Sequence, residues 1–151
     1  MQIQFVESHP KQKLLFFLAQ DVDDEARKLV RDAIEKMSSL RTWVIRAPEF
    51  VDTVESTGTR PGDALVETVG GVHEIYSASP SNHLPREIDA LLLEEVEYIV
   101  DSVQRLSQEH GLEFEFELDG QYVGTIDNGV IDAILAKGLI EEWRNHINAA
   151  N

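Results

Sequence analysis

The alternation of apolar and polar positions predicts strands and helices that follow one another along the chain. Residues 14–19 form an unbroken apolar run, which is typical of a strand buried on both faces. Apolar residues at three-and-four spacing then predict a helix over about 22–39. A second such stripe predicts a helix from Pro85 to about residue 109, and Gly111 favours its end there.

Three further segments are predicted to be strands: Gln2–Val6, Thr42–Val54 and Leu65–Ser77. Proline cannot donate a hydrogen bond to a neighbouring strand, so Pro48 either breaks the second segment or places it at an edge of the sheet. The pair Gly70-Gly71 predicts a bulge in the third segment. The chain from Val130 to about Ile147 has helical character, and Gly138 either caps or kinks it, because glycine costs about 1 kcal/mol inside a helix.

The clearest hairpin lies at residues 112–126, where apolar residues and glutamates alternate strictly up to Leu118. Such alternation is typical of a strand with one buried face. A three-residue loop that ends on Gly120 in the left-handed conformation is predicted to close the hairpin, which sets Phe116 opposite Tyr122. The residues predicted to face the core are Leu112, Phe114 and Phe116. The residues predicted to face outward are Glu113, Glu115 and Glu117.

Hairpins interleaved with helices indicate an α+β domain. We expect an antiparallel sheet of five to six strands with about three helices packed on it, in an order of two strands followed by one helix. Residues 1–151 contain no segment long enough to be a linker, so the chain is predicted to be a single domain.

The charge of the chain restricts the partners that it would bind. Asp and Glu number 28 against 13 Lys and Arg, which gives a formal net charge of −15 over 151 residues. Such a charge disfavours nucleic acid and anionic membrane surfaces, and it favours basic partners because complementary fields speed association. The alternative is that the acidity serves solubility alone.

Two acidic surfaces are candidate partner-binding sites. One is a strip on the second predicted helix, formed by Glu94, Glu97, Tyr98 and Asp101. Its tyrosine would supply an aromatic anchor of the kind found at interface hot spots. The other is the row formed by Glu113, Glu115 and Glu117. Carboxylates in such a row repel one another, and a basic partner or a divalent cation would relieve the repulsion. For both surfaces the alternative is an ordinary solvated face.

The sequence contains no motif for catalysis, and we predict no catalytic residue, no metal site and no cofactor. The chain has no cysteine, which excludes disulfides, thiolate catalysis and cysteine zinc sites. The five histidines show no paired helical spacing of the kind that zinc proteases use. His73 beside Glu74 is the best candidate for a general base, because histidine titrates near neutrality. The alternative is a structural histidine in a strand.

These observations favour an acidic protein-binding module that neutralises a basic protein, such as an immunity or inhibitor protein that blocks a toxin nuclease. The first residues lack the basic start of a secretory signal, so the cytoplasm is the expected location. One alternative is a small enzyme or ligand-binding protein with a pocket under two loops at 56–64 and 77–84. Another is a structural or regulatory subunit of a homo-oligomer, with a homodimer as the simplest form.

Overall fold

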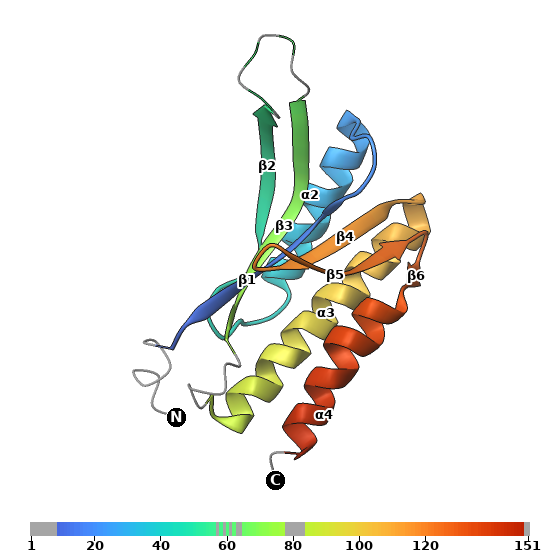
Figure 1. Ribbon diagram of the computed structural model, residues 1–151. Coiled ribbons are helices and arrows are strands. Elements are labelled where there is room, and N and C mark those ends of the chain that lie inside the picture. The colour runs from blue at the N-terminus through green and yellow to red at the C-terminus, as the bar shows by residue number, and fades with distance from the viewer. Residues whose placement is uncertain are drawn as a thin grey trace.

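The computed structural model describes residues 9–56, 58, 60, 62, 65–77 and 84–149. It contains one antiparallel sheet of six strands in the order β2-β3-β1-β4-β5-β6 (Figure 1). The strands are β1 (Lys11–Leu18), β2 (Glu49–Ser56), β3 (Leu65–Tyr76), β4 (Glu113–Leu118), β5 (Gln121–Asp127) and β6 (Val130–Ile131). The helices are α2 (Asp24–Ser39), α3 (Arg86–His110) and α4 (Glu142–Ala149), and α4 continues the π-helix η1 (Ile134–Glu141).

The predicted α+β class is therefore confirmed, and the predicted order of elements holds for its middle unit. There, two strands, β2 and β3, precede α3. The predicted strand Gln2–Val6 lies outside the described residues. The last unit contains a third strand, β6, where the sequence predicted the start of a helix. None of the described helices combines the length and the apolar character that a bilayer crossing requires.

One face of the sheet, which we call the helix face, carries all the described helices. Three contacts show this, one for each helical segment. A Cβ atom added to Gly71 would lie 2.8 Å from Ile34 of α2, and one added to Gly124 would lie 2.4 Å from Leu135 of η1. His73 hydrogen-bonds Glu95 of α3. Gly71, His73 and Gly124 all point to the same side of the sheet in the observed register.

The opposite face, which we call the open face, has no described helix on it. Strand β1 shows the difference, because Leu14, Phe16 and Leu18 are buried on the helix face while Leu15 and Phe17 are only half-buried on the open face. The prediction of a strand buried equally on both faces is therefore wrong. The other side of β1 belongs to the open face, which no described helix covers.

The core centres on Phe16, which stacks on Phe116 with ring centroids 5.8 Å apart. Gly71 lies opposite Phe16, and a Cβ atom there would come within 2.4 Å of the Phe16 ring. The register of β3 is unbroken along both β1 and β2, so the predicted bulge at Gly70-Gly71 is wrong. These glycines instead allow β1 and its large ring to approach β3 closely.

Strand β2 begins directly after Pro48 and lies at an edge of the sheet, as the proline predicted. Residues 40–48 before it form no strand, so the predicted strand at 42–54 starts too early. Helix α2 begins at Asp24, two residues after the predicted start at 22. Its N-cap is Asp23, whose carboxylate accepts a hydrogen bond from the amide of Ala26 at 2.7 Å.

The hairpin of β4 and β5 has the predicted faces but a different register. Asp119 and Gly120 both have positive φ, at 50° and 81°, which is the conformation of a two-residue hairpin turn. A bulge follows Phe116, so Phe116 pairs with Gly124 and Glu117 pairs with Tyr122. The predicted three-residue loop and the pairing of Phe116 with Tyr122 are wrong. The predicted core residues are confirmed, since the exposed fractions of Leu112, Phe114 and Phe116 are 5%, 1% and 0%.

Candidate functional site

The acidic row, formed by Glu113, Glu115 and Glu117, lies on the open face of β4. The alternation of this strand sends its phenylalanines into the core and its glutamates to the opposite side. The row therefore runs along the middle of the sheet, with β1 on one side and β5 on the other. Glu115 lies opposite Phe17 of β1 and Thr125 of β5. All three glutamates are half-buried.

The electrostatics of the row are those of like charges held close together. Burial raises the pKa of Glu115, and the negative charge of Glu117, a hydrogen bond with Glu117 and the charge of Glu113 raise it further. In the described part of the chain, no lysine or arginine forms an ion pair with any residue of the row. The row therefore carries a repulsion that these residues do not relieve.

An apolar strip lies beside the acidic row on the same face. It consists of Leu15, Phe17, Val51 and Val72, all half-buried. Leu15 lies between Val72 on one side and Glu117 on the other, so the strip and the row are in direct lateral contact in the sheet. Apolar area bordered by charge is the usual composition of a protein-binding surface.

The basic residues on the open face lie near the start of β1 and close to Glu74. Lys13 pairs with Glu74 across β1 and β3. On the other side of β1 its amide donates a hydrogen bond to Asp119 at 2.9 Å, so Lys13 lies near the Glu117 end of the row, although it forms no ion pair with a described residue there. Arg46 contacts Glu49 at 3.3 Å and Glu74 at 3.8 Å, so its charge already has carboxylate partners. The open face therefore carries the acidic row along β4 and a region of mixed charge at the start of β1, which meets the Glu117 end of the row.

The strip predicted on α3 is only partly exposed. Glu94 and Asp101 are exposed, whereas Glu97 and Tyr98 are half-buried. Glu97 forms an ion pair with Arg144 of α4 at 2.7 Å, and Tyr98 packs against Trp43 with ring centroids 6.0 Å apart. The expectation of one exposed strip is therefore wrong for Glu97 and Tyr98. Their predicted role in partner binding stays a prediction.

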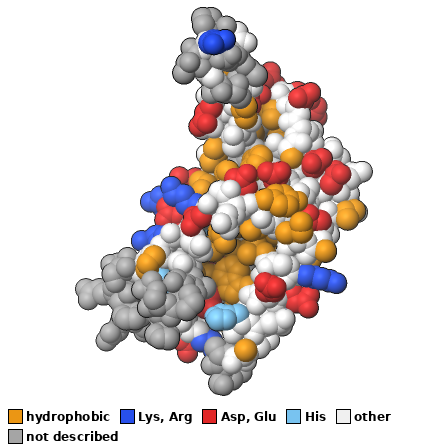
Figure 2. Space-filling model, viewed as in Figure 1, with side chains coloured by type: hydrophobic (Ala, Val, Ile, Leu, Met, Phe, Trp, Pro, Cys, Tyr) orange, Lys and Arg blue, Asp and Glu red, His pale blue; other side chains and the backbone are white. Residues whose placement is uncertain are grey.

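The two predicted acidic surfaces lie on opposite sides of the molecule. Helix α3 packs on the helix face of the sheet, and the acidic row lies on the open face. One partner surface cannot cover both without wrapping around the sheet. Figure 2 shows that acidic side chains are spread over the viewed face, with basic ones in fewer places.

His73 does not pair with Glu74 as predicted. Glu74 points to the open face, and His73 points into the helix layer, where its Nε2 hydrogen-bonds Oε1 of Glu95 at 2.9 Å. The other oxygen of Glu95 accepts a hydrogen bond from the amide of Val44 at 2.7 Å, and Trp43 packs edge-on against the imidazole. His73 and Glu95 are each 1% exposed, so this pair is closed to solvent and joins β3, α3 and residues 43–44.

Sequence reasoning missed Glu95, although the sequence contains a signal for it. Glu95 lies among the core-facing residues Leu92, Val96 and Ile99, so it is a carboxylate inside an apolar stripe. A buried carboxylate requires a partner, and the buried histidine supplies it. Nδ1 of His73 makes no hydrogen bond within the described part of the chain.

The loops at 56–64 and 77–84, under which a pocket was predicted, lie mostly outside the described residues. Two hollows are found elsewhere among the residues that the structure places. One lies between α2 and α3. The other lies where the end of β3 meets η1 and α4.

Comparisons with protein-family models, with curated proteins and with solved structures found no match to this chain. The functional argument therefore depends on the geometry of the chain itself.

Proposed function

We propose that this chain is a protein-binding module that docks a basic protein on the open face of its sheet. The observation that carries the proposal is the acidic row, which lies beside an apolar strip on a face without a described helix and lacks a described ion-pair partner. An immunity or inhibitor protein that neutralises a cationic toxin, such as a nuclease, is the class of binding module that we favour.

The chemistry of the row supports a cationic partner. Lysine or arginine side chains brought within about 4 Å of Glu115 and Glu117 would offset the repulsion between them. The net charge of −15 would also attract a basic protein over a longer range and raise its association rate. The apolar strip would supply contact area that holds the partner once it has arrived.

The same charges disfavour the homo-oligomer alternative at this face. Two copies docked through their open faces would bring two acidic rows together, and like charges across an interface are destabilising. A catalytic alternative through His73 and Glu95 would first require an opening of the core, because both side chains are closed to solvent.

The proposal is tested by affinity capture from the native cell with matched variants. Three proteins are compared: the unchanged chain, the row variant Glu115→Gln/Glu117→Gln and the control variant Glu94→Gln/Asp101→Asn. Each variant lacks two negative charges, so the two variants have the same net charge. We expect the wild-type chain and the control to capture one basic protein, and we expect the row variant to lose it. Hydrogen exchange of the complex should then show protection along β1 and β4.

The salt dependence and the control variant give the contradicting outcomes. Binding through the row should weaken as salt rises, because the contact is ionic and only partly buried. Equal capture by all three proteins would overturn the assignment of the site. Loss of partner capture in the control variant alone would mean that the interface lies on α3. A dimer of the chain that forms without any other protein would favour the homo-oligomer.

A further inference from the structure

A second hollow of about 240 Å³ opens where the sheet meets the C-terminal helices. Its lining residues are Gln12, Ile75, Tyr76, Leu118, Gly138, Leu139, Glu142, Trp143 and His146. Figure 2 shows an apolar depression with a histidine at its border in the lower half of the viewed face. None of its lining residues belongs to the acidic row or to the apolar strip, so it is separate from the proposed docking face.

The π-helix η1 forms one wall of this hollow. A run of eight residues in this conformation is unusual, because π-helices are mostly single turns and are frequent at functional sites. Gly138 lies in the middle of η1 and lines the hollow. A Cβ atom at Gly138 would meet only Ile134, at 3.9 Å, so the protein packing does not require glycine there.

Two aromatic residues also line the hollow, and both have contacts that hold them in place. Trp143 donates a hydrogen bond from its indole nitrogen to Asp89 of α3 at 2.6 Å, which fixes the ring. Tyr76 is 5% exposed and packs edge-on against His9. Ile75, Leu118 and Leu139 complete an apolar lining, so the hollow suits a flat apolar group. A cavity of about 150 Å³ is known to hold benzene, so this one has room for a one- or two-ring compound.

The polar groups of the lining favour a positive charge on that compound. Glu142 is the only charged residue among the lining residues that the structure describes apart from His146, and no lysine or arginine is among them. No described cation lies over Trp143.

We propose that this hollow is a binding site for a small aromatic amine. The ring would lie against Trp143 and above Gly138, and the ammonium group would approach Glu142 at the rim. A neutral ring of the same shape should bind more weakly, and an anionic one more weakly still, because the chain carries a strong negative charge.

Three probes that share one ring system test the proposal: tryptamine, which is cationic, indole, which is neutral, and indole-3-acetate, which is anionic. Binding is followed by the shift of the Trp143 indole N–H signal in the NMR spectrum of the full chain, at constant pH and salt. The chain has two tryptophans, so Trp43→Phe identifies the signal. We expect tryptamine to bind most tightly and indole-3-acetate least.

Two variants sharpen the test, and neither should unfold the protein. Gly138→Ala adds a methyl group at the wall of the hollow and should weaken tryptamine and indole alike by about tenfold, with no fall in thermal midpoint, because alanine favours a helix over glycine. Glu142→Gln should weaken tryptamine by about threefold and leave indole unchanged. Glu141→Gln is the matched control, since Glu141 precedes it and does not line the hollow.

Three outcomes would overturn the proposal. One is the absence of any Trp143 shift with the three probes at millimolar concentration. Another is an affinity for indole-3-acetate equal to that for tryptamine, which would mean that charge plays no part. The third is an unchanged affinity in Gly138→Ala, which would place the probe elsewhere on the surface.

Discussion

The carboxylates on the helix face and those of the acidic row are held in opposite ways. On the helix face, each carboxylate near the sheet has a partner of its own chain. Asp52 of β2 and Glu67 of β3 share the guanidinium of Arg27, and Glu95 meets His73. On the open face, the three glutamates of the acidic row have no described cation. The pKa of Glu115 is raised by burial first, and by Glu117 and Glu113 after it. The difference separates carboxylates that are paired within the fold from carboxylates that have no described cation, which are the ones we propose for an outside partner.

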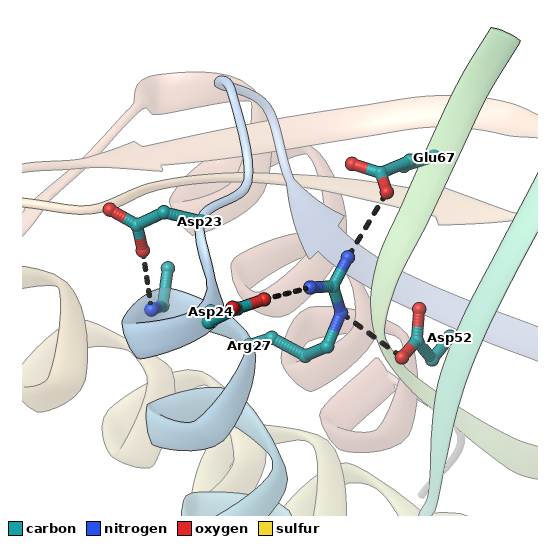
Figure 3. A network of polar contacts seen from close by, with 6 residues as sticks. Asp23, Asp24, Arg27, Asp52 and Glu67 are labelled. Atoms are coloured by element: carbon teal, nitrogen blue, oxygen red, sulfur yellow. Dashed lines mark hydrogen bonds and ion pairs between the residues drawn. The ribbon is translucent and has the colours of Figure 1, made fainter.

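Arg27 is the centre of the partnered arrangement (Figure 3). Its guanidinium lies 3.1 Å from Asp24 on its own helix, 3.1 Å from Asp52 and 3.1 Å from Glu67. Its side chain is 23% exposed, so these contacts are partly shielded from water. One cation thus joins the first turn of α2 to both strands of the β2–β3 hairpin. The acidic row has the same number of carboxylates and no equivalent of Arg27 among the described residues.

The largest effect that separates the faces should come from phenylalanine. Phe116 is fully buried on the helix face, and Phe17 is half-buried on the open face. Phe116→Ala should lower the free energy of unfolding by about 3–5 kcal/mol, because it removes a ring from a closed core. Phe17→Ala should cost clearly less. Urea unfolding of both variants measures the difference, and equal costs would mean that the open face is as closed as the helix face.

The next largest effect should come from the buried pair on the helix face. Glu95→Ala leaves the Val44 amide and the His73 ring without their carboxylate and should cost about 3 kcal/mol. Its neighbour Glu94 is exposed on the same helix, and Glu94→Ala should change stability by less than about 0.5 kcal/mol. Thermal or urea unfolding checks both. A small cost for Glu95→Ala would show that His73 and Val44 find other partners.

A smaller effect should come from the Arg27 network. Arg27→Ala leaves Asp52, Glu67 and Asp24 without their shared cation and should cost about 1 kcal/mol, because the contacts are only partly buried. Arg31 lies one turn further along α2, and its only ion pair with another described residue is to Asp32, at 4.0 Å, so Arg31→Ala is the matched control. The cost of Arg27→Ala should shrink as salt rises. A cost equal to that of the control would mean that the network contributes no stability.

Local patterns predicted most of the fold. The alternation of residues 112–118 predicted the two faces of β4 correctly, because a strand with one buried face must alternate. The same alternation could not predict the register, since the bulge after Phe116 shifts the pairing without changing the pattern of β4 itself. The pair Gly70-Gly71 suggested a bulge from local sequence alone. Its actual role is to let Phe16 approach closely, and Phe16 lies more than fifty positions away in the chain.

The sites were harder to predict because their partners come from distant segments. The sequence indicated the acidic row, since its three glutamates belong to one strand. It did not indicate that Glu97 and Tyr98 are engaged by Arg144 and Trp43, which come from other elements. Neighbours in sequence also suggested Glu74 as the partner of His73, although adjacent residues of a strand point to opposite faces. Tertiary contacts decide which carboxylates remain without a cation. A sequence pattern alone indicates only contacts between residues that are close in the chain.

The smallest effect, and the only one expected to have the opposite sign, should come from Glu115→Gln on the open face. Because the pKa of Glu115 is raised above its ordinary value of 4.5, the folded state holds the neutral acid more readily than the unfolded state does. Below pH 4.5 the group is protonated in both states, and its contribution to stability is fully present. As pH rises through the folded pKa, that contribution is lost in the wild-type chain. The Glu115→Gln variant has no carboxyl group at this position, so its stability does not fall in this way as pH rises.

The thermal midpoint of Glu115→Gln should therefore rise relative to that of the wild type as pH increases from about 4 to 7, with a stability gain of at most about 0.5 kcal/mol. Glu94→Gln removes the same charge from an exposed helix position and measures the general effect of net charge, so its gain should be smaller. Added salt should reduce the gain of Glu115→Gln only in part, because burial is the largest cause of the shift and salt screens only the charges of Glu117 and Glu113. A Glu115→Gln variant less stable than the wild type at neutral pH would show that the carboxylate already has a cation within its own chain, and the contrast between the two faces would then fail.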